Sequence, residues 1–275
     1  MNNLVTTVWL ANHLNDADIC ILDCSWHLPS AKRNVKAEFE AAHIQGAQFF
    51  DLDAISDTES KLPHMLPSAE KFGREVSKLG VGNDKKIICY DSVGLFSAAR
   101  VWWMFKVFGH TNVAVLNGGL RKWQAQNRAV QSGHSDKPPH GNFWARLNSN
   151  MIAEIGDVAG TKSQIIDARS PARFHGEEPE PRPSVKPGHI PKAKNIHYGS
   201  LLHTDGSLRG SRTLQLLFNK AKIDRNKPII TSCGSGVTAA ILTLALTELG
   251  ATDLKLYDGS WAEWGASGRE IATGA

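Results

Sequence analysis

The stretch that decides the fold of this chain is Lys227–Ala240, which reads K-P-I-I-T-S-C-G-S-G-V-T-A-A. A short apolar run, Ile229-Ile230, leads to Cys233 and a glycine-spaced loop, and the apolar run Ala239–Leu246 follows. This order predicts a buried strand, a tight loop and a helix. The cysteine is expected where the strand meets the loop.

The loop after Cys233 has the composition of an anion-binding loop. Gly234 and Gly236 lack a Cβ, so the backbone can curl with its N–H groups pointing inward. These amides and the positive end of the following helix dipole favour an anion, here the thiolate of Cys233, which is the reactive form of a cysteine. A buried, inert cysteine is the alternative interpretation. The two glycines and the neighbouring Thr238 favour the reactive one.

The bulk composition excludes several classes of function. Apolar residues make up 41% and charged residues 21% of the 275 residues, so the sequence predicts a globular protein of two domains. The net charge of +4 is too small to indicate nucleic-acid binding and fits a small anionic substrate. The four cysteines form no C-x-x-C pair, which predicts neither a metal site nor a disulfide scaffold. We expect a cytoplasmic protein, with no signal peptide and no membrane span.

Strand and helix patterns alternate along the first half of the chain. Short apolar runs between turn residues predict strands, and apolar residues at helical spacing predict helices. The expected strands are Ile19–Leu22, Lys86–Tyr90 and Val113–Leu116, and the expected helices are Glu38–His43, Ser68–Leu79 and Ala98–Phe108. Such alternation predicts an α/β fold, in which a parallel sheet is flanked by helices on both faces.

The second half repeats this plan at a nearly constant offset, which indicates a duplicated domain. The matched landmarks are Asp23 with Asp167, His43 with His189, Ile87 with Ile229 and Trp123 with Trp264, at offsets of 144, 146, 142 and 141 residues. Between the halves, Gln131–Asn142 is rich in glycine and proline and is predicted to be a linker. We expect one domain at 1–130, a linker at 131–145 and a second domain at 146–275.

The two copies of the domain differ at the position of the expected nucleophile. At an offset of 142 residues, Cys233 aligns with Asp91, followed by Ser92-Val93-Gly94. A carboxylate cannot act as a sulfur nucleophile in the way a thiolate can. The first domain is therefore expected to be non-catalytic.

Four motifs together resemble the family of two-domain rhodanese-like sulfurtransferases, and the resemblance covers nearly the whole chain. The motifs are D-A-R with R-F (Asp167–Arg169, Arg173-Phe174), G-H-I-P (Gly188–Pro191), C-G-S-G-V-T-A (Cys233–Ala239) and Y-D-G-S-W-A-E-W (Tyr257–Trp264). The resemblance implies two tandem rhodanese-like domains. Within the family, the chain is most similar to the enzymes that use 3-mercaptopyruvate. Gly234 and Ser235 are neutral, whereas relatives that prefer thiosulfate usually carry basic residues there.

The resemblance also implies roles for further residues. Arg173 and Arg182 would hold the substrate carboxylate, a task that suits the planar fork of arginine. Without the resemblance, a surface ion pair with neighbouring glutamates would be the better interpretation of Arg182. Asp53, His64 and Ser235 would form a proton relay with the logic of a hydrolase triad, although each could instead be an ordinary loop residue. The substrate-binding loop would comprise Gly234, Gly236, Val237 and Thr238.

The expected reaction is a two-step sulfur transfer. Cys233 would take sulfur from 3-mercaptopyruvate, release pyruvate and hold the sulfur as a persulfide. A thiol, such as that of a thioredoxin-like protein, or cyanide would then accept it, and no metal or organic cofactor is expected. A thiosulfate:cyanide sulfurtransferase of the same fold and a non-enzymatic persulfide carrier are the alternatives. A phosphatase of the C-x5-R type is disfavoured, because Ala239 stands where that arginine would be.

Overall fold

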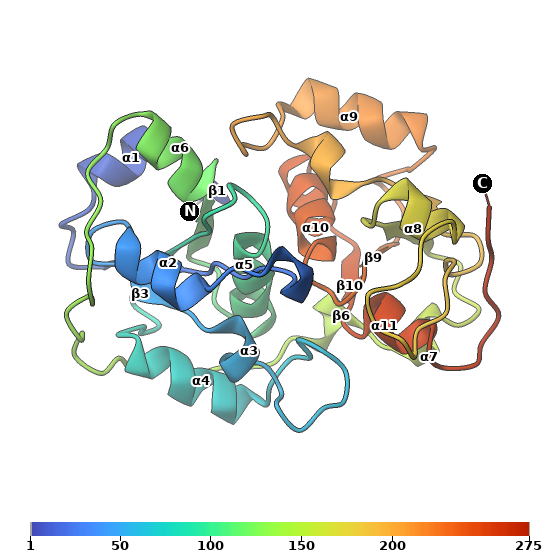
Figure 1. Cartoon of the computed structure of the whole chain (residues 1–275), viewed down its shortest axis with the longest axis horizontal. Helices are drawn as coiled ribbons and strands as arrows, with labels where there is room; N and C mark the ends of the chain where they lie inside the picture. Colours follow the sequence, from blue (N-terminus) through green and yellow to red (C-terminus); the bar gives the residue numbers. More distant parts are fainter. Residues whose placement is uncertain (1, 275) are drawn as a thin grey trace. The chain divides into compact units, whose positions relative to one another are not determined.

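The computed structural model describes residues 2–274, and the chain divides into two compact units (Figure 1). The first unit holds the chain up to Thr58, Pro67–Asn148 and His203–Leu208; the second holds Glu59–Leu66, Ser149–Leu202 and the chain from Arg209 onward. Each unit therefore includes a short segment from the other half of the sequence. The contiguous domain limits expected above stay a prediction.

The first unit is built on a five-stranded parallel sheet in the order β1-β5-β4-β2-β3. Its strands are short, and the central ones are buried on both faces, as expected of a parallel sheet covered by helices. The strands are β1 (Leu4–Val5), β2 (Ile19–Asp23), β3 (Gln48–Phe49), β4 (Lys86–Tyr90) and β5 (Val113–Leu116).

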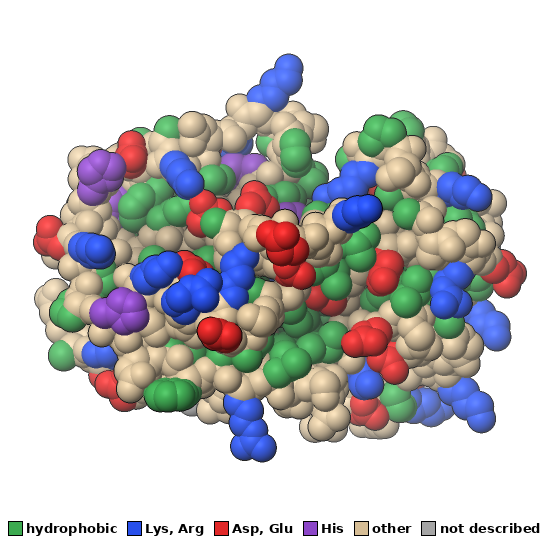
Figure 2. All heavy atoms as spheres, turned by 90° about the horizontal axis from the view of Figure 1, so that it is seen from below, with side chains coloured by type: hydrophobic (Ala, Val, Ile, Leu, Met, Phe, Trp, Pro, Cys, Tyr) green, Lys and Arg blue, Asp and Glu red, His purple; other side chains and the backbone are tan. Residues whose placement is uncertain are grey.

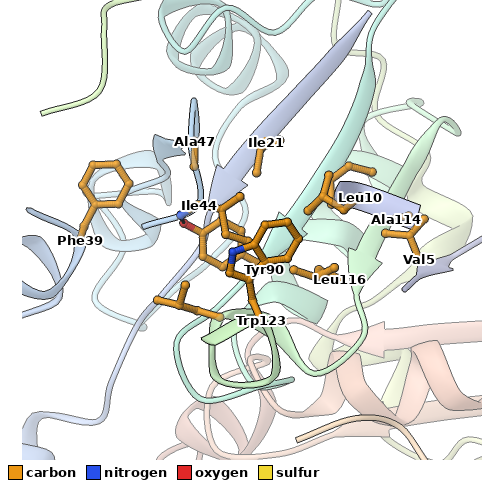
Figure 3. Packing of buried hydrophobic residues seen from close by; sticks show 12 residues of the cluster. Val5, Leu10, Ile21, Phe39, Ile44, Ala47, Tyr90, Ala114, Leu116 and Trp123 are labelled. Carbon is orange, nitrogen blue, oxygen red and sulfur yellow. Dashed lines mark hydrogen bonds between the residues drawn. The ribbon is translucent and has the colours of Figure 1, made fainter. Parts of the chain in front are cut away.

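Helices cover both faces of this first sheet. They are α1 (Thr7–Asn12), α2 (Val35–Ala41), α3 (Leu52–Ile55), α4 (Ala69–Lys78), α5 (Ala98–Val107) and α6 (Gly119–Ala125), with a 3₁₀ turn at Pro29–Ala31. On one face, Leu10, Phe39 and Trp123 from α1, α2 and α6 pack against Ile21 and Tyr90 of the strands (Figure 3). On the other face, α5 packs against β4 and β5.

The second unit has the same architecture. Its sheet is parallel in the order β6-β10-β9-β7-β8, which matches the first sheet strand for strand. The strands are β6 (Ile152–Ala153), β7 (Gln164–Asp167), β8 (Lys194–Asn195), β9 (Ile229–Ser232) and β10 (Leu254–Tyr257). The helices are α7 (Ile155–Val158), α8 (Pro171–His175), α9 (Ser211–Lys220), α10 (Ala239–Glu248) and α11 (Ser260–Trp264), with 3₁₀ turns at Ser149–Met151 and Tyr198–Leu201. The predicted α/β fold with helices on both faces is confirmed.

The duplication extends to a matched pair of buried histidines. In the first unit, His43 Nδ1 lies 2.7 Å from the carbonyl oxygen of Phe39, and the two rings stack at 4.1 Å. In the second unit, His189 Nδ1 lies 2.8 Å from the carbonyl oxygen of Phe174, and these rings stack at 3.8 Å. Each histidine supports the turn that leads into a short edge strand. His43 and His189, which occupy equivalent positions in the two halves of the sequence, therefore have the same structural role.

The segment between the two halves lies along the first unit. Gln131 forms an antiparallel bridge with His43, with N···O distances of 2.8 and 2.9 Å. Further along, Gly141 donates its N–H to the carbonyl oxygen of Ser77, and Phe143 donates its N–H to the Ser77 hydroxyl at 3.0 Å. The segment is thus bonded to the unit it follows.

The surface carries both signs of charge. Figure 2 shows lysine and arginine side chains interspersed with aspartate and glutamate on one face, in line with the small net charge of +4. Within residues 2–274, no helix is both long enough and apolar enough to cross a membrane.

Candidate active site

Cys233 lies where the sequence pattern places it, directly after β9 and before the loop that leads into α10. The residue is only 2% exposed. Its N–H donates to the hydroxyl of Ser260 at 3.2 Å, and its carbonyl oxygen accepts from the N–H of Trp261 at 2.9 Å. These two bonds attach the end of the strand to the start of α11 and fix the position of the thiol.

The loop that follows presents unused hydrogen-bond donors. Gly236 has φ +76°, a left-handed conformation that favours glycine, and it lets the backbone turn sharply. Within the described part of the chain, the backbone amides of residues 234–238 donate to no acceptor. Such amides beside the N-terminus of α10 favour an anion, whether the thiolate or a group bound to it.

The equivalent loop of the first unit is occupied by its own side chain. Asp91 directly follows β4, and its buried carboxylate accepts the N–H groups of Val93, Gly94, Phe96 and Ala98 at 2.7–3.0 Å. This loop therefore curls around an anion supplied by the protein itself. At the same position, the second unit supplies a thiol in place of a carboxylate.

Replacing Asp91 with alanine is expected to destabilise the protein by at least about 3 kcal/mol, because four amides, three of them in buried residues, lose their acceptor. Urea denaturation of the variant measures this loss. Cys233→Ala, at the matched position, is the control and should cost less, because the thiol accepts none of its loop's amides. Equal stability of the two variants would contradict this account of the loop.

A chain of alternating charges lies beside the loop in the second unit. Arg169, whose side chain is 1% exposed, donates to Asp167 Oδ2 and to Glu180 Oε1, each at 2.7 Å. Glu180 in turn accepts from Arg173 Nη2 at 2.5 Å. Burial works to lower the pKa of Arg169, but the carboxylates of Asp167 and Glu180 outweigh it and raise that pKa. The guanidinium of Arg169 also stacks on Trp261, 4.5 Å from the ring centre.

The two predicted substrate-binding arginines have different surroundings. A Cβ on Gly234 would lie 3.2 Å from Arg173 Nη2, so the guanidinium of Arg173 lies against the cysteine loop. Arg182 is half-buried, and within residues 2–274 it forms no ion pair and no side-chain hydrogen bond. Burial lowers the pKa of Arg182, as does Arg173, while Glu180 and Cys233 act to raise it. The surface ion pair considered for Arg182 is thus not formed.

Ser235 and His64 come together although 171 residues separate them in the sequence. His64 Nδ1 lies 3.0 Å from Ser235 Oγ, and both residues are buried. The segment that carries His64 belongs to the second unit, where Leu66 donates its N–H to Asp258 Oδ2 at 2.8 Å. His64 has φ +59°, a conformation that is costly for a non-glycine residue and that recurs at functional sites.

Asp53 lies in the other unit. It belongs to α3, and its Oδ2 accepts the indole N–H of Trp26 at 3.2 Å. Its part in a relay with His64 stays a prediction.

Sequence reasoning missed the supporting role of three residues. Ser260 holds the amide of Cys233, Asp258 holds the segment that carries His64, and Glu180 joins two arginines. Ser260 and Asp258 lie within the Y-D-G-S-W motif, whose polar residues before a buried helix were the available signal. Glu180 lies two residues before Arg182, and nothing in the spacing shows which arginine it pairs with.

Comparison with known proteins agrees with this geometry. The family model of the rhodanese-like domain matches residues 6–126 and 151–267. The 3-mercaptopyruvate sulfurtransferase of Escherichia coli (strain K12) is 44% identical over 263 residues, which is 94% of this chain and 93% of the relative. The 3-mercaptopyruvate sulfurtransferase of Homo sapiens is 42% identical over 271 residues, 95% of this chain and 91% of the relative.

A solved structure extends the likeness from sequence to fold. The crystal structure of SseA from Escherichia coli, a 3-mercaptopyruvate sulfotransferase with the rhodanese fold, superposes with a TM-score of 0.86 at 41% identity. The match covers 95% of this chain and 99% of that one. Two matched domains, a cysteine at the end of the second sheet's central strand and relatives of this identity lead to one conclusion: the chain belongs to the family of two-domain rhodanese-like sulfurtransferases.

Proposed function

We propose that this protein transfers sulfur from 3-mercaptopyruvate to a thiol acceptor through a persulfide on Cys233, with release of pyruvate. The observation that carries the proposal is the pairing of a fixed, buried cysteine with a cation, Arg182, that forms no ion pair within residues 2–274. A small donor that joins a carboxylate to a sulfur atom can meet both groups at once. The relatives named above carry the same substrate in their names.

The first half-reaction moves one sulfur atom. The thiolate of Cys233 attacks the sulfur of 3-mercaptopyruvate, an S–S bond forms, and the C–S bond breaks. The electron pair of that bond passes to the carbon, so pyruvate leaves as its enolate and then takes up a proton. Arg182 pairs with the carboxylate, Arg173 lies alongside, and the free amides of residues 234–238 stabilise negative charge on the sulfur.

The second half-reaction restores the enzyme. An acceptor thiolate attacks the outer sulfur of the persulfide, and the thiolate of Cys233 leaves. A thiol of low molecular mass, a thioredoxin-like protein or cyanide can serve as the nucleophile. Because the donor product departs before the acceptor reacts, steady-state kinetics are expected to be ping-pong.

We assign Ser235 and His64 to the proton relay. Their 3.0 Å contact lets the imidazole polarise the hydroxyl, which can then deliver a proton to the enolate. Asp53 is proposed to orient His64, by analogy with a triad. We also propose a cytoplasmic location, supported by the four cysteines, all of which are free thiols.

Replacing Ser235 with alanine is expected to lower kcat for 3-mercaptopyruvate by about 10²-fold, a typical contribution of positioned proton transfer. Turnover of thiosulfate should fall much less, because sulfite leaves without needing a proton on carbon. Steady-state rates with both donors test this, and Ser267→Ala, at an exposed serine, is the control. An equal loss with both donors would show that Ser235 only supports the loop.

The proposed substrate is tested by comparing donors on the unaltered protein. The measurement is kcat/KM for 3-mercaptopyruvate and for thiosulfate with the same thiol acceptor, and we expect a clear preference for 3-mercaptopyruvate. A clear preference for thiosulfate would replace the proposal with a thiosulfate:cyanide sulfurtransferase. Persulfide uptake from another protein, without turnover of either small donor, would identify a carrier.

A further inference from the structure

Five charged side chains form a cluster in the second unit, and two of its arginines lie at the cysteine loop. The cluster comprises three arginines and two carboxylates: Arg169, Arg173, Arg182, Asp167 and Glu180. The pairing within the cluster is unequal. Asp167 is held by Arg169, and Glu180 bridges Arg169 and Arg173, whereas Arg182 has no carboxylate partner within residues 2–274. The five side chains together therefore carry one net positive charge, to which the thiolate of Cys233 adds one negative charge when it forms.

We infer that Glu180 sets the donor preference, because its negative charge weakens the attraction of the arginines for a dianion such as thiosulfate about twice as much as for a monoanion such as 3-mercaptopyruvate. The inference rests on the proposed function and deepens it. It assigns the choice of donor to a charge on the arginine cluster as well as to the neutral residues of the cysteine loop.

Three observations single out Glu180. Its side chain is only 4% exposed, so solvent screens its charge weakly. It accepts from Arg173 through both Nη2, at 2.5 Å, and Nε, at 3.3 Å, which occupies the fork that would otherwise face the substrate. Asp167 already contacts Arg169 through both carboxylate oxygens, at 2.7–3.2 Å, so Glu180 supplies the charge that neutralises Arg173.

The neighbouring glutamates do not share this role. Glu177 and Glu178 lie in the same segment, and both are exposed. Within the described residues, neither forms an ion pair. Glu178 therefore offers a matched control, because its neutralisation changes the net charge of the protein equally but leaves the cluster unchanged.

The test is Glu180→Gln, which removes one negative charge and nearly preserves the shape of the side chain. The cluster then carries one more unit of positive charge, which favours a dianion more than a monoanion. The ratio of kcat/KM for thiosulfate to kcat/KM for 3-mercaptopyruvate is expected to rise at least about tenfold, the scale of one added charge within several ångströms at an effective dielectric constant near 20. Added salt should reduce the rise.

Two variants separate charge from positioning. Glu178→Gln should leave the ratio unchanged. Glu180→Asp keeps the charge but shortens the side chain, so both donors should lose activity while the ratio stays within about twofold of the unaltered protein. A ratio that does not change in Glu180→Gln, with equal losses for both donors, would show that Glu180 merely positions Arg173 and would overturn the inference.

Thermal unfolding of each variant checks that it is folded. If Glu180→Gln does not fold, inhibition of the unaltered protein by pyruvate and by sulfate at equal ionic strength supplies the test. The monoanion should inhibit at the lower concentration, and stronger inhibition by sulfate would contradict the inference. If the protein turns over 3-mercaptopyruvate but shows neither the changed donor ratio nor the stronger inhibition by pyruvate, the inference about Glu180 is wrong and the proposed function stands. A protein that does not use 3-mercaptopyruvate refutes the proposed function.

Discussion

Replacing Cys233 with serine is expected to reduce sulfur transfer by more than about 10³-fold with every donor, since an alkoxide is a poor nucleophile toward sulfur and a hydroxyl cannot carry a persulfide. The fold should survive, because serine can keep both backbone bonds that fix the position, the amide to Ser260 and the carbonyl to Trp261. Steady-state turnover of 3-mercaptopyruvate measures the loss, and thermal unfolding checks the fold.

Cys20→Ser is the matched control. Burial raises the pKa of Cys20 to about 12, so this cysteine stays a thiol at neutral pH and does not compete as a nucleophile. Its variant should retain nearly full kcat. Near-normal activity of Cys233→Ser, or a comparable loss in Cys20→Ser, would remove Cys233 from the mechanism.

Replacing Arg182 with alanine is expected to lower kcat/KM for 3-mercaptopyruvate by about 10²-fold or more, in the range for loss of one partner of a charge-assisted pair. Arg182 makes no ion pair within residues 2–274, so its guanidinium is available to a substrate carboxylate, whereas that of Arg173 is engaged by Glu180. The protein should be no less stable, because within the described residues the Arg182 side chain forms no hydrogen bond or ion pair that the substitution removes.

Arg182→Lys separates the contribution of the planar guanidinium group from that of its positive charge. Lysine keeps a positive charge but cannot bind a carboxylate through two parallel hydrogen bonds, so kcat/KM should fall to a value between those of the unaltered protein and of Arg182→Ala. The comparison requires initial rates over a range of donor concentrations for the three proteins. Unaltered kcat/KM in Arg182→Ala would place the carboxylate elsewhere.

The regular elements could be predicted from the sequence where the local signal was continuous. Lys86–Tyr90 and Val113–Leu116 form strands over the expected residues, because each contains an unbroken run of four apolar residues between turn residues. The helix expected at Glu38–His43 instead spans Val35–Ala41, since Asn34 caps it by accepting the N–H groups of residues 36 and 37. Two-residue strands such as β1 and β8 carry no periodic signal, and the sequence did not show their ends.

The residues of the candidate site also differ in whether the sequence could predict them. Cys233 and its glycine loop could be found because the strand, loop and helix are contiguous in the sequence. The contact between His64 and Ser235 spans 171 residues, and no spacing rule connects them; only the family resemblance suggested it. Without the family resemblance, an ion pair with one of the neighbouring glutamates was the better interpretation of Arg182, but the glutamate nearest to it in this segment, Glu180, pairs with Arg173 and Arg169. Side-chain pairing in an irregular segment depends on turns that residue spacing does not encode.

The central claim is that Cys233 takes a sulfur atom from 3-mercaptopyruvate and releases pyruvate. The most direct measurement is intact-protein mass after adding 3-mercaptopyruvate without an acceptor, with released pyruvate assayed in the same sample. The account predicts a gain of about 32 Da, one sulfur atom, located on Cys233, and one equivalent of pyruvate, both absent from Cys233→Ser. A mass gain on another cysteine, or pyruvate release by the protein with serine at position 233, would contradict it.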